Sequence, residues 1–85
     1  MAEVRIAVEA QDGTVGENIG NIAEALKKLD YVYKVETLAH AGTKCRFLVF
    51  ARSEKLGDLF GLQPRIQQLL GVKKIIFAEH VTSTT

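Results

Sequence analysis

Three side chains in this 85-residue chain offer the nitrogen or sulfur donors that bind transition metals: His40, Cys45 and His80. Imidazole nitrogen and thiolate sulfur are ligands that Zn²⁺ prefers. We expect all three residues at one edge of the predicted sheet, although His80 would still lie roughly 14 Å from the strand of His40 within one subunit. A shared metal would therefore need a dimer. The favoured interpretation is a buried thiol with two partly exposed histidines, and no cofactor is predicted.

Cys45 and His40 could also pair across a short turn as a nucleophile and its base. Covalent catalysis needs, in addition, an oxyanion site and a pocket, and the sequence indicates neither. A cysteine without these partners usually behaves as a small apolar side chain. We therefore predict that the protein is not an enzyme.

Gly13, Gly16 and Gly20 span a predicted turn and the start of a predicted helix. Backbone amides at such a position can bind a carboxylate or phosphate. The glycine spacing matches neither the dinucleotide-binding fingerprint nor a P-loop. Two interpretations stay open: binding of an anion or amino acid, and close packing of the helix on the sheet, which is the more ordinary of the two.

The first half of the chain predicts a strand followed by a helix. Apolar and polar residues alternate over residues 3–10, which is typical of a strand with one buried face. Thr14 and Glu17 have the spacing of a capping box, so we expect the helix to open at Thr14. Its apolar residues recur every three or four positions up to Leu29, which defines one buried helix face.

The second half predicts a hairpin, a helix and a last strand. Gly42 suits the turn of the hairpin. Ser53 is expected to cap the second helix, which breaks or kinks before Pro64, resumes, and ends at a left-handed Gly71. The other predicted elements are strands over 31–40, 45–52 and 73–81 and a polar tail over 82–85.

The element order βαββαβ predicts a ferredoxin-like α+β fold in a single domain over residues 1–81. Right-handed connections give an antiparallel sheet in the order 4-1-3-2, with two helices on one face. Leu48 and Phe50 would then point from the uncovered face. Hiding about 400 Å² of apolar surface contributes about 10 kcal/mol before association costs. We therefore expect a homodimer or higher homo-oligomer with Leu48 and Phe50 in its interface.

Composition excludes several other classes of function. Eleven basic and ten acidic residues give a net charge of +1, and no basic block is present, so direct nucleic-acid binding is not expected. Phe50 alone does not make the aromatic platform of an RNA-binding sheet. No apolar run is long enough to span a membrane. A single cysteine favours a reducing, cytoplasmic location.

From Ile22 onward the chain contains, in order, Leu26-x-x-Leu29 leading into Val32 and Val35, the hairpin glycine Gly42, and Leu70-Gly71-Val72-Lys73. This order of features resembles the C-terminal regulatory module of the Lrp/AsnC transcription factors, which also occurs as a stand-alone RAM domain. Separately, the turn over residues 12–16 resembles the effector-contacting first loop of ACT domains, a related architecture.

This resemblance implies dimerisation through the sheets and amino-acid binding near the dimer interface. We therefore predict a regulatory or ligand-sensing module of the RAM/ACT type that binds an amino acid or similar small anion at a homodimer interface. Gly13, Gly16, Gly42 and Thr43 are the predicted binding residues, donating backbone amides to a carboxylate. The alternative is a protein-interaction or structural module with no small-molecule ligand.

Overall fold

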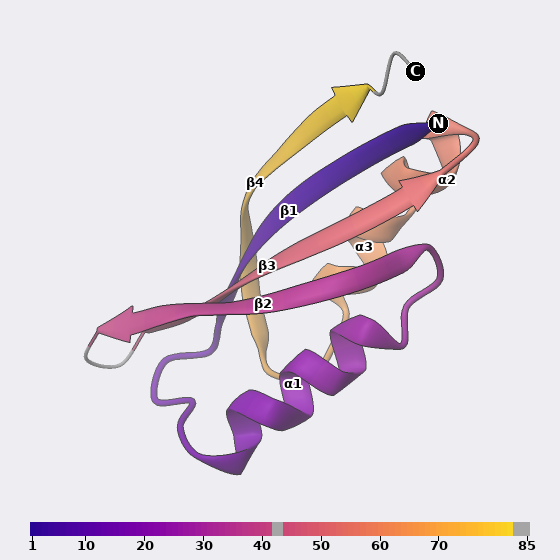
Figure 1. The fold of residues 1–85 in the computed structure, drawn as a ribbon. Helices are drawn as coiled ribbons and strands as arrows, with labels where there is room; N and C mark the ends of the chain where they lie inside the picture. The colour runs from indigo at the N-terminus through magenta and orange to yellow at the C-terminus, as the bar shows by residue number, and fades with distance from the viewer. Residues whose placement is uncertain (42–43, 83–85) are drawn as a thin grey trace.

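A computed structural model describes residues 1–41 and 44–82, with side chains described for 1–38 and 44–80. The predicted binding residues Gly42 and Thr43 therefore lie outside the described residues. In chain order the elements are β1 (Ala2–Ala10), α1 (Glu17–Lys27), β2 (Val32–Ala41), β3 (Lys44–Ser53), α2 (Leu56–Phe60), α3 (Leu62–Gln67) and β4 (Val72–Thr82) (Figure 1).

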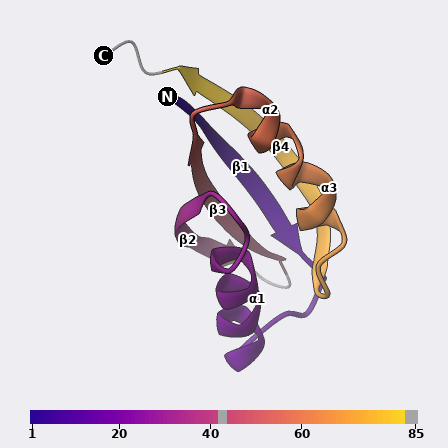
Figure 2. The ribbon, with the colours of Figure 1, turned by 90° about the vertical axis from the view of Figure 1, so that its right-hand side faces the viewer.

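The four strands form one antiparallel sheet in the order β2-β3-β1-β4. This is the predicted ferredoxin-like order, and the fold prediction is confirmed. The helices lie on one side of the sheet (Figure 2), where α1 packs against β2 and β3, α2 against β1 and β3, and α3 against β4. Among the described residues, no helix is long and apolar enough to cross a membrane.

The core lies between the helices and the sheet face that they cover. Every second residue of β1 and β3 points into it, as the alternating sequence predicts. The helices contribute the apolar residues that recur at helical spacing. The buried core residues are Val4, Ile6, Val8, Ala10, Ile22, Leu26, Cys45, Phe47, Val49, Ala51, Leu59, Leu62, Ile66 and Val72.

Both predicted helix caps are wrong. Helix α1 begins at Glu17 after Gly16, without a side-chain cap, because the Thr14 hydroxyl donates instead to the Gln11 carbonyl oxygen at 2.6 Å. Helix α2 likewise begins three residues beyond Ser53, which ends β3. The Ser53 hydroxyl donates to an Asp58 carboxylate oxygen at 2.7 Å and accepts the Lys55 backbone N–H. In both places the side chain predicted to cap the helix makes hydrogen bonds within a local turn instead.

The predicted interruption before Pro64 is present, and of the two alternatives it is a break rather than a kink. Helix α2 ends at Phe60 and α3 begins at Leu62, with Gly61 between them in a right-handed helical conformation (φ −68°). Pro64 lies in the first turn of α3, where its missing N–H would have no intrahelical partner. The predicted second helix is therefore two short helices in sequence.

Two turns of the same type follow α1 and α3. In each turn two backbone N–H groups donate to the carbonyl oxygen three residues earlier. The donors are Leu29 and Val32 after α1, and Leu69 and Val72 after α3. The residue before each valine has a positive φ: 92° at Gly71 and 73° at Tyr31. Glycine tolerates this conformation, whereas in a tyrosine it costs about 1–2 kcal/mol. Tyr31 is the only non-glycine residue with positive φ among the described residues.

Candidate ligand site

The loop between β1 and α1 is held against the turn between α3 and β4. The Gln11 backbone N–H donates to the Gly71 carbonyl oxygen at 2.8 Å, and its side-chain amide donates to the Val72 carbonyl oxygen at 3.3 Å. Lys73 and Asp12 form an ion pair at 3.4 Å. These contacts fix the loop where α1 begins.

A hollow of about 280 Å³ opens beside this loop, and we call it the loop hollow. Asn18 and Asn21 lie three positions apart on α1 and therefore share one helix face. Leu70 stands at the rim with 96% of its surface exposed. The residues that line the hollow are Thr14, Asn18, Asn21, Ile22, Leu70 and Gly71.

The lining offers hydrogen bonds without a charged side chain. Each asparagine amide supplies two donors and one acceptor oxygen, and a threonine hydroxyl can accept as well as donate. The hollow lies at the N-terminal end of α1, where unpaired backbone N–H groups favour a negatively charged group. Ile22 and Leu70 add apolar surface. This combination suits a small ligand that carries a carboxylate and an apolar part.

The predicted glycines lie near this hollow but not in its lining. Gly13 and Gly16 have φ values of 83° and 62°, so each position needs the conformational freedom of glycine. A Cβ atom built on Gly16 or Gly20 meets nothing within 4 Å. The interpretation that these glycines allow close packing on the sheet is therefore wrong. Sequence reasoning missed Asn18 and Asn21, because polar residues on an outer helix face resemble an ordinary solvated surface.

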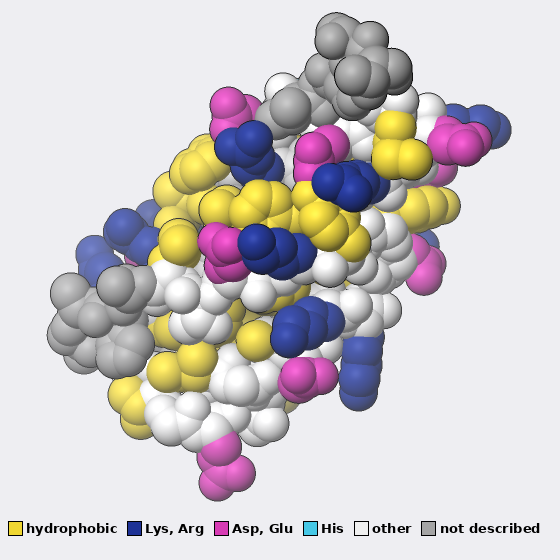
Figure 3. Space-filling view, viewed as in Figure 1, with side chains coloured by type: hydrophobic (Ala, Val, Ile, Leu, Met, Phe, Trp, Pro, Cys, Tyr) yellow, Lys and Arg dark blue, Asp and Glu magenta, His cyan; other side chains and the backbone are white. Residues whose placement is uncertain are grey.

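The sheet face away from the helices, which we call the open face, carries Leu48 and Phe50 as predicted. Ala7 lies between Leu48 and Phe77 in the strand registers, so these three residues form an apolar row across β3, β1 and β4. An irregularity in the β1–β4 pairing between Ala7 and Val8 turns Phe77 to this side. Figure 3 shows this face, with apolar side chains flanked by neighbouring groups of opposite charge.

Charged and aromatic side chains cover part of the open face. The Arg52 guanidinium lies 4.1 Å from the centre of the Tyr33 ring, and the Lys34 ammonium lies 5.3 Å from that of Phe50. Glu3 accepts a hydrogen bond from the Tyr33 hydroxyl and pairs with Arg52 at 3.4 Å. These contacts shield Phe50, whereas Phe77 remains 51% exposed. The apolar part that is free to contact another molecule therefore centres on Phe77.

The contacts of Glu3 predict a pH-dependent stability. The hydrogen bond from Tyr33, with the nearby Arg52, lowers the pKa of the Glu3 carboxyl below its ordinary value of 4.5. A carboxyl with a lowered pKa in the folded state stabilises above its unfolded pKa, and loses this effect as the pH falls through the folded value. Urea-unfolding midpoints should therefore fall more steeply below about pH 4.5 in the wild type than in Glu3→Gln. Parallel curves would contradict the assignment.

The metal-capable residues do not share one edge of the sheet. Cys45 lies at the start of β3 and His80 near the end of β4. Strands β3 and β4 both run antiparallel to β1, and His80 pairs with Val4, whose β3 partner is Ala51. Cys45 and His80 are therefore about 20 Å apart along the strands. The prediction that placed them at one edge is wrong, because it overlooked that β3 and β4 run parallel.

The surroundings of these residues are those of ordinary side chains. Cys45 is fully buried, and burial raises the pKa of its thiol. His80 is exposed, and its ring packs edge-to-face with that of Phe60 at 4.9 Å between ring centres. The His40 side chain lies outside the described part. Within the described part, no three His, Cys, Asp or Glu residues are grouped as a metal site.

The sheet order and the helices on one face define the fold class, a small α+β domain of ferredoxin-like topology that is shared with ACT domains. Among solved structures, the protein TTHA0845 from Thermus thermophilus is similar with a TM-score of 0.74 and 15% identity, covering 100% of this chain and 98% of that one. The ACT domain from GTP pyrophosphokinase of Chlorobium tepidum gives 0.51 and 20% identity, covering 96% and 85%. Neither known family models nor curated protein sequences match this chain.

Proposed function

We propose that this protein is a non-enzymatic regulatory module that binds an amino acid or similar small anion in the loop hollow. The observation that supports this most is the pair Asn18 and Asn21, which line a hollow beside the start of α1. An amide N–H and the helix start favour a carboxylate. The exposed Leu70 offers an apolar contact for the rest of the ligand. The ACT-like fold is consistent with such a role.

The proposal includes a homodimer that forms through the open face. The loop hollow lies on the helix side of the sheet, so Leu48, Phe50 and Phe77 would not contact a ligand there. Dimerisation and ligand binding are therefore separable properties that can be tested independently.

A thermal-unfolding panel with the twenty amino acids tests the ligand. A ligand at a hundred times its dissociation constant adds about 2.7 kcal/mol, which raises the midpoint of a domain this size by roughly 10 °C or more. Asn21→Ala should weaken the response about tenfold or more in apparent Kd, because one hydrogen bond to a charged group is lost. Gln67→Ala is the matched control, since it removes an exposed amide on α3 that lies outside the hollow.

A selective shift that Asn21→Ala weakens and Gln67→Ala preserves would establish the proposed site. An equal loss in both variants would place the ligand elsewhere. A flat panel would instead favour a protein-interaction module without a small-molecule ligand. The exposed apolar side chains of Leu70 and Phe77 are the observation that supports this second candidate.

A further inference from the structure

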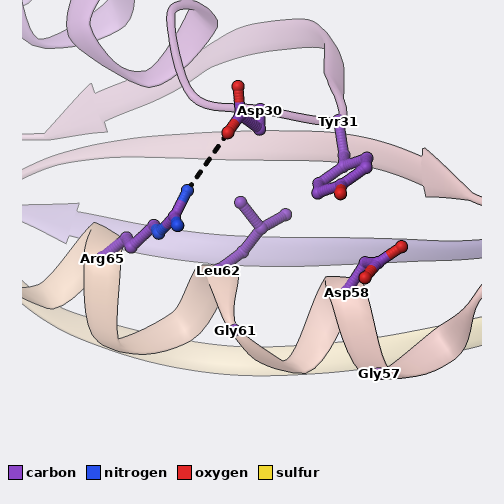
Figure 4. Close-up of a pocket in the computed structure, with 7 residues that line it drawn as sticks. All are labelled: Asp30, Tyr31, Gly57, Asp58, Gly61, Leu62 and Arg65. Carbon is purple, nitrogen blue, oxygen red and sulfur yellow. Dashed lines mark hydrogen bonds and ion pairs between the residues drawn. The ribbon is translucent and has the colours of Figure 1, made fainter.

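A second hollow, of about 270 Å³, lies at the other end of α1, and we call it the helix hollow. It opens between the turn after α1 and the α2–α3 pair (Figure 4). Its volume lies slightly below that of typical ligand cavities, which measure about 300–1,000 Å³, so only a small ligand would fit. The residues that line it are Asp30, Tyr31, Gly57, Asp58, Gly61, Leu62 and Arg65.

Two glycines keep the helix hollow open. Gly57 and Gly61 lie four positions apart, which places them on one side of the α2 segment. Gly61 has a right-handed helical φ of −68°, and neither glycine has a positive φ. A Cβ on Gly57 would meet nothing within 4 Å, and one on Gly61 only a backbone oxygen at 3.5 Å. Neither backbone conformation nor packing requires glycine, although glycine destabilises a helix.

Tyr31 is held in its left-handed conformation at the opposite wall. The Arg52 backbone N–H donates to the Tyr31 carbonyl oxygen at 3.0 Å, which fixes the residue in place. The equivalent position after α3 is Gly71, so the turn itself does not need a side chain. Figure 4 shows the Tyr31 side chain pointing toward the α2–α3 pair, with Asp58 opposite. Strain at one residue is a common feature of functional sites.

The charges of the lining are not balanced. Asp30 and Arg65 pair at 3.3 Å near the rim, with both side chains more than half exposed. The Asp58 carboxylate accepts one hydrogen bond, from the neutral Ser53 hydroxyl, and has no ion-pair partner within the described part. The lining therefore carries one excess negative charge beside an aromatic ring. A carboxylate and an aromatic face together favour an organic cation.

A neighbouring hollow of about 570 Å³ adjoins the helix hollow. Tyr31 and Asp58 line both hollows, so a ligand held between them could extend into either. The neighbouring hollow adds one negative group, Glu54, and two positive groups, Lys55 and the Met1 α-amino group, so the excess negative charge is confined to the helix hollow. The helix hollow therefore suits a cationic head, and the neighbouring hollow gives room for an alkyl chain.

We infer that the helix hollow binds a small alkylguanidinium or alkylammonium compound. Its cationic head pairs with the Asp58 carboxylate against the Tyr31 ring, and its alkyl chain lies over Gly57 and Gly61. This site lies at the opposite end of α1 from the loop hollow, and it does not depend on the proposed function.

The test is a titration of ¹⁵N-labelled protein with agmatine at constant ionic strength, followed by the Gly57 and Gly61 amide signals. We expect saturable shifts, and no comparable shifts with n-butyramide, which is neutral. Asp58→Asn should weaken agmatine binding tenfold or more, because the amide oxygen still accepts the Ser53 hydrogen bond but the charge is gone. The amino-acid panel should be unaffected by Asp58→Asn, which separates this site from the loop hollow.

Gly61→Ala gives a second, independent readout. It should raise the unfolding midpoint by about 4–8 °C, since alanine is the better helix former, while it weakens agmatine binding by filling the hollow. Gly20→Ala on α1 is the matched control: it should stabilise similarly and leave binding unchanged, because Gly20 does not line the helix hollow. Equal agmatine shifts in the wild type and Asp58→Asn, or unchanged binding in Gly61→Ala, would overturn the inference.

A capped arginine, N-acetyl-arginine amide, distinguishes the source of the cation. Binding of agmatine alone supports a free small molecule as the ligand. Equal binding of the capped arginine supports the same chemistry presented by a side chain of another protein. Absence of binding by both compounds would reject the site.

Discussion

Replacing Gly71 with alanine is expected to lower the free energy of unfolding by about 2–3 kcal/mol. The φ of 92° at Gly71 is unfavourable for any residue with a Cβ, by about 1–2 kcal/mol. A Cβ there would also lie 2.9 Å from the terminal methyl of Ile22. Ile22 is buried, so moving it adds an overpacking cost of about 1–3 kcal/mol. The loss of chain entropy in the unfolded state offsets less than about 1 kcal/mol of this.

Urea or thermal unfolding measures this effect directly, and the midpoint should fall by roughly 10–20 °C. Tyr31→Gly is the natural control, because Tyr31 occupies the equivalent turn after α1. It should leave stability unchanged or raise it by up to about 1 kcal/mol, since relief of the left-handed strain exceeds the entropy that glycine adds to the unfolded chain. Equal losses in the two variants would show that the two turns are not equivalent.

The turns at Tyr31 and Gly71 differ in how well the sequence predicts their conformation. The left-handed conformation of Gly71 is predicted correctly, because glycine favours it. The predicted helix end at Gly71 is wrong, since α3 already ends at Gln67 and Gly71 lies in the turn that follows. Tyr31 adopts a similar conformation without any such signal, because the turn is fixed by hydrogen bonds within it and by β3. Local residue type therefore predicts one of two equivalent turns, and tertiary contacts determine the other.

The helix starts are mispredicted for a related reason. Thr14 and Ser53 both have side chains that can cap a helix, and both bind their own turns instead. The energies of these alternatives differ by about 1 kcal/mol, which is too little for sequence pattern alone to decide between them. The strand order, in contrast, follows from chain connectivity and burial, and its prediction is correct.

The candidate sites are the least predictable part of the molecule. Asn18, Asn21 and Leu70 form the loop hollow only because the α3–β4 turn lies beside α1. Asp58 and Tyr31 face each other from segments that are far apart in the sequence. A site that is assembled from exposed polar residues on separate elements has no local periodicity, so the sequence contains little sign of it.

Replacing Phe77 with glutamate is expected to convert the proposed homodimer into a monomer. Phe77 ends the apolar row of Leu48, Ala7 and Phe77 on the open face, and its ring is half exposed in the single chain. The substitution should therefore cost little stability in the monomer. In a two-fold dimer the substitution is present on both sides of the interface. On each side it removes an apolar contact and buries a carboxylate. We expect the dimer dissociation constant to rise by about a hundredfold or more, which corresponds to roughly 3 kcal/mol.

Light scattering and sedimentation at micromolar concentration measure the mass of each variant. Phe60→Glu is the matched control: Phe60 is 49% exposed but lies on α2, on the helix side of the sheet. Because the open face is the proposed interface, a dimeric Phe60→Glu beside a monomeric Phe77→Glu would assign dimerisation to that face. A wild type that is monomeric at this concentration would instead show that Tyr33, Lys34 and Arg52 shield the open face sufficiently by themselves. The masses therefore decide between two roles for the side chains of Tyr33, Lys34 and Arg52. Either they shield the open face of a monomer, or they surround the apolar contact in a dimer.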